Sequence, residues 1–203
     1  CMDISANGQI AYLQNDTLFL ADANGGSLRP FLSVAGCPSW SPDGRQIAFA
    51  LNGLSVVNVE TGQIRLLSDD LHVYGKGFRR YLEALAWSPD GSKLTALSGS
   101  WGGASLVFFD VATADRFVLA GYSTTPAWSR DGQVIYTANP DYACELGQPP
   151  YLARVDIRLN QPANLLGGAE ADLRGGFAPF ETADGRLLAL TSRLEGTPCG
   201  DTF

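Results

Sequence analysis

The stretch "SDDLHVYGKGFRRYLEA", residues 68–84, holds the residues best suited to binding chemistry. Its cations are interleaved with aromatic rings: Tyr74, Lys76, Phe78, Arg79, Arg80 and Tyr81. Such a cluster can hold an anionic or aromatic group, or anchor a protein interface. A second interpretation is also open, in which the cations neutralise neighbouring carboxylates while the rings pack into the core.

Two further aromatic residues stand in glycine- or proline-rich stretches. Trp101 lies in "SGSWGGAS", where it has little apolar company, and Tyr142 lies in "ANPDYACELGQPPY". Both a contact role and a packing role remain open for these side chains. The candidate binding residues are therefore Tyr74, Lys76, Arg79, Arg80, Tyr81, Trp101 and Tyr142.

The sequence carries no motif for catalysis or for a cofactor. His72 is the one histidine, and neither G-x-S-x-G nor a phosphate-binding glycine loop occurs. No cysteine spacing fits a zinc site. Hydrolysis by two carboxylates stays open, because paired acids need not be close in the sequence. We assign no catalytic residue, no metal ligand and no cofactor, and interpret His72 as a hydrogen-bonding loop residue.

The composition of the chain narrows the classes of molecule that the protein can bind. The chain has 203 residues, is 45% hydrophobic and has a net charge of -7. This charge argues against nucleic acid as a partner, because neutralising phosphates requires an excess of Lys and Arg. No apolar run approaches the roughly 18 residues of a membrane span, so we expect no transmembrane segment.

One phrase returns along the chain: "WSPDGRQIAFA" from Trp40, "WSPDGSKLTAL" from Trp87 and "WSRDGQVIYTA" from Trp128. A degraded fourth copy contains Asp184-Gly185, and a weak copy opens the chain. The turn pairs are Asp43 with Gly44, Asp90 with Gly91, and Asp131 with Gly132. The period is about 40 to 50 residues, as in proteins built from repeated supersecondary units. We place the units at residues 1–35, 36–70, 82–121, 124–168 and 177–203, in a single domain.

Each unit has the pattern of a four-stranded antiparallel meander. The Asp-Gly pair predicts a hairpin turn, because Gly adopts positive φ without steric cost. A second strand with an acidic end follows, as in "LSVVNVE", which ends at Glu60. Such sheets bury their faces by stacking radially. The predicted fold is an all-β propeller with about four full blades plus part of another. Trp40, Trp87 and Trp128 are expected to pack between blades.

The phrase "WSPDG", followed by "IAF" and a strand with an acidic end, resembles the TolB-like propeller repeat. The resemblance implies a propeller that usually has six or more blades, so this chain is interpreted as a fragment or an open ring. Members of the family are periplasmic binding proteins or non-catalytic domains that precede a peptidase of the prolyl-oligopeptidase type. The repeats of the family carry no catalytic residues.

The four cysteines suggest a disulfide and an oxidising compartment. Cys144 and Cys199 fall in corresponding loops of adjacent units, which predicts a bond between them. Cys37 is interpreted as a small buried apolar residue. Cys1 is either a lipidation site or a residue added in cloning. Cys1 and Cys37 hold matching repeat positions, each three residues before Trp40 or its counterpart Ile4.

In such a meander the short Asp-Gly turns share one face, and every long insertion falls on the other. This asymmetry favours a non-enzymatic protein- or peptide-binding module of an exported bacterial protein, periplasmic or extracellular, and leaves open a lipid anchor through Cys1. One alternative is an enzyme part, either a propeller gating a peptidase or a small-molecule hydrolase or lyase site over the channel. Another is a structural protein that self-associates through an open blade edge.

Overall fold

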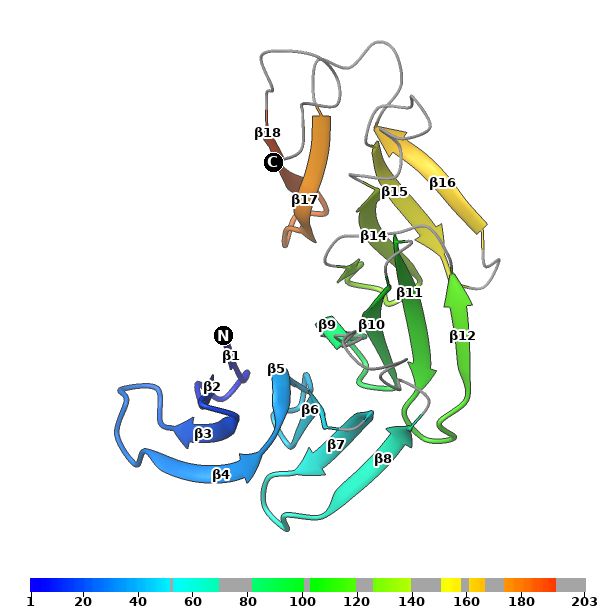
Figure 1. Cartoon of the computed structure of the whole chain (residues 1–203). Helices are drawn as coiled ribbons and strands as arrows, with labels where there is room; N and C mark the ends of the chain where they lie inside the picture. Colours follow the sequence, from blue (N-terminus) through cyan, green and yellow to red (C-terminus); the bar gives the residue numbers. More distant parts are fainter. Residues whose placement is uncertain are drawn as a thin grey trace, which may run out of the picture. The chain divides into compact units, whose positions relative to one another are not determined.

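The computed structural model describes residues 1–51, 53–69, 82–100, 103–119, 126–139, 151–157, 161–166 and 174–192. Within these residues every regular element is a β-strand (Figure 1). Four antiparallel sheets have four strands each in sequential order, and β17 and β18 form a two-stranded sheet. This arrangement confirms the predicted propeller architecture of four complete blades and part of another.

The strands of the first two blades are regular and short. The first blade consists of β1 (Met2–Ile4), β2 (Ile10–Gln14), β3 (Thr17–Ala21) and β4 (Arg29–Ser33). The second blade consists of β5 (Ala35–Trp40), β6 (Gln46–Ala50), β7 (Leu54–Asn58) and β8 (Ile64–Ser68). β7 ends at Asn58, so the prediction that this strand reaches Glu60 was wrong.

The later blades follow the same order. The third consists of β9 (Leu82–Trp87), β10 (Lys93–Ser100), β11 (Gly103–Asp110) and β12 (Arg116–Leu119). The fourth consists of β13 (Ala127–Trp128), β14 (Val134–Asn139), β15 (Tyr151–Asp156) and β16 (Gln161–Leu166). The last two strands are β17 (Arg174–Glu181) and β18 (Leu187–Ser192).

Two stretches predicted as loops contain strand. β10 runs to Ser100 and β11 begins at Gly103, so most of "SGSWGGAS" lengthens a hairpin. β17 begins at Arg174, which lies inside the predicted connection to the last unit. Glycine and serine carry little strand propensity of their own, and pairing with a neighbouring strand outweighs that weak local preference.

The chain forms two compact units, Cys1–Gly99 with Val107–Phe117 and Ser100–Leu106 with Val118–Phe203. Two hydrophobic clusters hold the first unit together, one at each seam between its blades. Trp40 lies in the first seam and is 5% exposed, among Ala11, Leu18, Leu20, Val34, Ile47, Phe49 and Val57. Trp87 lies in the second seam, among Ala48, Leu54, Val56, Leu67, Leu94, Ala96, Val107, Phe109 and Val111. Alternate residues of each strand thus face opposite seams.

Polar groups also cross both seams. The Asp3 carboxylate accepts a 2.7 Å hydrogen bond from the backbone N–H of Trp40. The Trp87 indole N–H donates to the carbonyl oxygen of Ser39 at 3.0 Å. Trp128 belongs to β13 in the second unit and is half-buried.

Candidate binding surface

The candidate binding residues taken from the sequence lie outside the described residues. They are Tyr74, Lys76, Arg79, Arg80, Tyr81, Trp101 and Tyr142, and His72 lies outside them as well. Their role stays a prediction. The described strands fix where the connections that carry them leave and rejoin the sheets, since β8 ends at Ser68 and β9 begins at Leu82.

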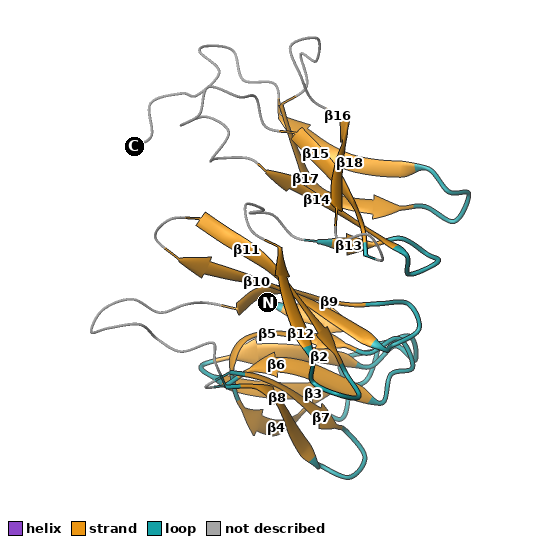
Figure 2. Ribbon diagram, turned by 90° about the vertical axis from the view of Figure 1, so that its right-hand side faces the viewer, coloured by secondary structure: helices purple, strands orange, loops and turns teal. Residues whose placement is uncertain are grey.

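At the ends of the sheets opposite the β8–β9 connection, short loops join the strands (Figure 2). Hydrogen bonds close these turns. In the second blade, Val59 N–H donates to Arg45 O at 3.0 Å, which ties the turn after β7 to the turn after β5. In the third blade, Val111 N–H donates to Ser92 O at 2.9 Å in the same way. We call this end of each blade the clasped end.

The hydroxyl of a serine or threonine closes each of the four Asp-Gly turns. The Ser88 hydroxyl accepts a 2.9 Å hydrogen bond from Lys93 N–H and donates to the Asp90 carboxylate at 2.6 Å. The same carboxylate accepts from Ser92 N–H at 3.0 Å. Gly91 completes the turn with a φ of +70°. We call this arrangement of hydroxyl, carboxylate and backbone N–H groups a Ser–Asp clasp. Its hydrogen bonds restrain the conformation of the turn.

The clasp recurs in other blades with nearly the same distances. Ser41 and Asp43 form it in the second blade, Ser129 and Asp131 in the fourth, and Thr182 and Asp184 in the last pair of strands. The Asp and Gly residues of these turns were predicted from the sequence, but the role of the hydroxyl was not. The signal was present, because Ser41, Ser88 and Ser129 hold one position of the repeated phrase.

Hydrogen bonding keeps the clasp carboxylates ionised. The hydroxyl of Ser88 is the largest cause that lowers the pKa of Asp90 below its usual 3.8, followed by Ser92 N–H. The hydroxyls of Ser41, Ser129 and Thr182 lower the pKa values of Asp43, Asp131 and Asp184 in the same way. The clasped end therefore carries fixed negative charge.

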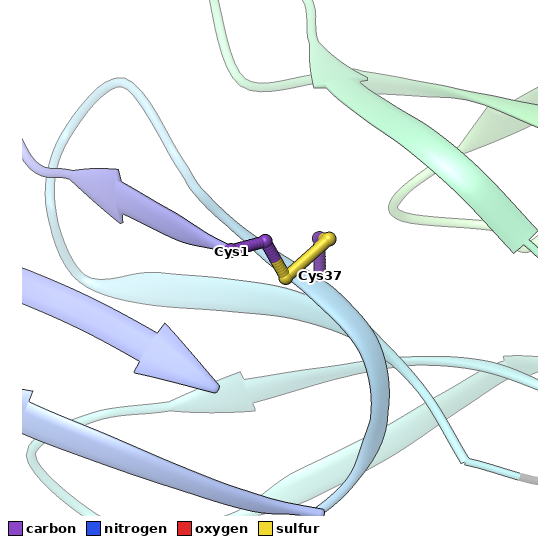
Figure 3. The surroundings of a disulfide bond; sticks show 2 residues. All are labelled: Cys1 and Cys37. Atoms are coloured by element: carbon purple, nitrogen blue, oxygen red, sulfur yellow. A yellow bond between two sulfur atoms is a disulfide. The ribbon is translucent and has the colours of Figure 1, made fainter. Parts of the chain in front are cut away.

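A disulfide joins Cys1 to Cys37, with their Cα atoms 5.6 Å apart (Figure 3). Cys37 is exposed, so its interpretation as a small buried residue was wrong. The matching repeat positions of the two cysteines were the signal, because equivalent residues of adjacent inner strands lie side by side. Cys144 and Cys199 lie outside the described residues, and their bond stays a prediction.

The disulfide also bears on the lipid anchor. A thioether-linked lipid would need the Cys1 sulfur, which is bonded here to Cys37. Lipidation of Cys1 and this disulfide are therefore mutually exclusive in one molecule. In the described part of the chain, no helix is long and apolar enough to cross a membrane.

A hollow lies at the clasped end of the first seam. This cavity of about 820 Å³ is open to solvent and is lined by Asn7, Gln9, Leu20, Asp22, Arg29, Asp43, Gly44, Arg45, Val59 and Glu60. A smaller cavity of about 340 Å³ lies between the clasps of Asp43 and Asp90. Among the described residues, no group of three or more His, Cys, Asp or Glu could hold a metal ion.

Comparisons with known proteins agree with the fold. No protein-family model matches the sequence, and no curated protein matches it. The structure of TolB from Acinetobacter baumannii is similar over 96% of this chain, with a TM-score of 0.62 and 19% identity. A chain of the nidogen/laminin complex is similar over 89% of this chain, with a TM-score of 0.60, 12% identity and 68% of its own length covered.

A puromycin-hydrolyzing peptidase of Mycobacterium tuberculosis is also similar, over 94% of this chain, with a TM-score of 0.59 and 18% identity. This chain spans 48% of TolB and 35% of the peptidase. At these identities the similarity shows the fold alone, and function has to be argued from the surface. The protein thus has a β-propeller fold, and its structure is similar to those of TolB and of this peptidase.

Proposed function

We propose that the chain is a non-enzymatic propeller module that captures a protein or peptide at the ends of its blades opposite the clasps. The contrast between the two ends carries the proposal. One end is closed by Ser–Asp clasps of nearly identical geometry. At the other, long connections link β8 to β9 and β14 to β15. Rigid scaffolds commonly present binding residues on such variable connections.

We further propose that the protein is exported. The Cys1–Cys37 disulfide supports this, because such bonds persist in oxidising compartments. Nucleic acid is disfavoured as a partner by the net charge of -7. Self-association through an open blade edge remains a prediction, for which light scattering at several concentrations is the direct measurement.

The test is capture combined with crosslinking. The immobilised chain is mixed with a bacterial periplasmic extract, and crosslinked peptides are identified by mass spectrometry. We expect crosslinks in residues 70–81, and loss of the captured protein when Arg79, Arg80 and Trp101 are all replaced by Ala. The control is Arg186→Ala, which removes an exposed cation at a clasped turn. Undiminished capture by the triple variant would contradict the proposal.

A role beside a peptidase is the second candidate, favoured by the structural similarity to the Mycobacterium tuberculosis peptidase. In that case the propeller would gate access to a catalytic domain. The full coding sequence discriminates the two, since a G-x-S-x-G segment with a later Asp and His marks such a domain. A hydrolase or lyase site over the central channel of the propeller would instead require a cluster of Asp and Glu side chains.

A further inference from the structure

Arg29 in β4 and Arg65 in β8 hold the same place in successive blades. Arg29 lies opposite Leu20, and Arg65 lies opposite Val56. The strand registers place Leu20 and Val56 at matching positions of their sheets. The two arginines therefore start from equivalent backbone positions, and any difference between them lies in what their side chains contact.

Arg65 closes the second seam. Its guanidinium donates to the carbonyl oxygens of Val111 and Ala112, with 3.1 Å to Ala112, at the turn that follows β11. A guanidinium group is well suited to this position because it offers several donors in one plane. Two blades are thus joined by a cation bound to two backbone carbonyls.

The first seam lacks this closure. Val59 and Glu60 match Val111 and Ala112, since the backbone hydrogen bonds of the two turns correspond one to one. Within the described residues, the carbonyl oxygens of Val59 and Glu60 accept no hydrogen bond. The guanidinium carbon of Arg29 lies instead 5.3 Å from the ring centroid of Phe31, in its own blade.

Val59 and Glu60 line the cavity of about 820 Å³ at the first seam. Leu20 and Arg29 line the same cavity. Asp22 and Glu60 supply negative charge there. A second arginine that lines the cavity, Arg45, lies close to Asp43, and its charge helps to lower the pKa of that carboxyl. Leu20 and Val59 offer apolar surface for a methylene stem.

We propose that this groove binds an arginine side chain of a partner protein or peptide, whose guanidinium occupies the carbonyls of Val59 and Glu60 as Arg65 occupies those of Val111 and Ala112. Asp22 and Glu60 add charge complementarity. The site goes beyond the function proposed above, because it lies at the clasped end and not on the long connections. It gives this groove a preference for arginine-containing peptide segments.

The test uses the peptide acetyl-Gly-Gly-Arg-Gly-Gly-amide and its citrulline counterpart, which keeps the shape but lacks the charge. Binding to the whole chain is followed by backbone amide NMR. We expect the arginine peptide to shift the amides of Leu20, Val59 and Glu60, and the citrulline peptide to bind at least about fivefold more weakly. Equal binding of the two peptides, or shifts only elsewhere, would overturn the proposal.

Substitutions localise the site. Glu60→Gln and Asp22→Asn should each weaken the arginine peptide roughly fivefold. Asp16→Asn removes the same charge at the β2–β3 turn, away from the cavity, and should leave affinity unchanged. Equal weakening by all three variants would indicate a general charge effect and sink the assignment. The triple variant of Arg79, Arg80 and Trp101 should bind the arginine peptide as tightly as the parent chain does. A failure of the proposed arginine site is therefore distinguishable from a failure of the proposed function.

Discussion

The indole nitrogen of Trp87 donates a 3.0 Å hydrogen bond to the carbonyl oxygen of Ser39, the residue that directly precedes Trp40. The bond links the inner strand of one blade to the recurrent tryptophan of the next. Trp40 holds the same repeat position one blade earlier, yet its buried indole nitrogen has no partner among the described residues. The recurrent tryptophans therefore share a place in the seam but differ in their polar contacts.

Replacing these tryptophans by phenylalanine should separate packing from hydrogen bonding. Trp40→Phe and Trp87→Phe remove similar buried surface, but only Trp87→Phe leaves the Ser39 carbonyl without its donor. We expect Trp87→Phe to lower the free energy of unfolding by about 1–2 kcal/mol more than Trp40→Phe. Urea unfolding of both variants measures the difference. Equal losses would mean that the hydrogen bond contributes nothing net.

The clasp aspartates predict an acid-dependent stability. Hydrogen bonds lower the folded-state pKa of Asp90 and its counterparts below 3.8. A group with a lowered folded pKa contributes its full stabilisation above the unfolded pKa and loses it as the pH falls through the folded value. The free energy of unfolding should therefore fall as the pH drops below about 4.

The contribution of one clasp can be isolated. Asp90→Asn removes the titrating carboxylate, and Ser88→Ala removes the largest cause of its lowered pKa. Both variants should be less stable than the parent chain at neutral pH and should lose less stability on acidification. Urea unfolding between pH 7 and pH 3 gives these slopes. Parallel pH curves for the parent chain and both variants would show that this carboxylate is not linked to folding.

The sequence alone predicted the blade architecture because its local signals repeat. The glycines of the four Asp-Gly pairs have φ values of +68° at Gly44, +70° at Gly91, +68° at Gly132 and +80° at Gly185. A turn that needs positive φ strongly favours glycine, so it can be recognised from the amino-acid sequence alone. The number of strands per unit follows from the alternation between successive turns.

Contacts between blades were less predictable. Arg29 and Arg65 are the same residue at matching positions, yet one stacks on Phe31 and the other reaches the next blade. No local pattern distinguishes them, because the outcome depends on the space left by the neighbouring blade. The Cys1–Cys37 bond likewise depends on which inner strands are adjacent, and the matching positions alone left other pairings open.

The Cys1–Cys37 disulfide should contribute substantially to stability. It links residues separated by 36 positions, and loop-closure entropy for such a loop is worth about 4 kcal/mol at most. We expect Cys1→Ser with Cys37→Ser to lower the free energy of unfolding by up to this amount. Urea unfolding with and without reductant provides the measurement.

Peptide mapping without reduction tests the predicted Cys144–Cys199 bond separately, and a free thiol at either residue would refute it.

Gly53 and Gly62 provide a matched pair at positive φ. A Cβ on Gly53, which has a φ of +141°, would lie 2.1 Å from the carbonyl oxygen of Ser68, where β8 ends and the connection to β9 begins. A Cβ on Gly62, with a φ of +70°, would meet no atom within 4 Å. Ala114 occupies the corresponding turn position of the third blade at +64°, so alanine is tolerated there.

Gly62→Ala should therefore cost only the conformational penalty of about 1 kcal/mol, whereas Gly53→Ala should cost about 3 kcal/mol or more, because the backbone of β8 must move. Since the displaced backbone leads into residues 70–81, Gly53→Ala should also weaken capture of a partner through that connection, while Gly62→Ala should leave capture intact. Urea unfolding and the capture assay on the same preparations test both effects. Equal stability of the two variants would contradict the close approach of Gly53 to β8.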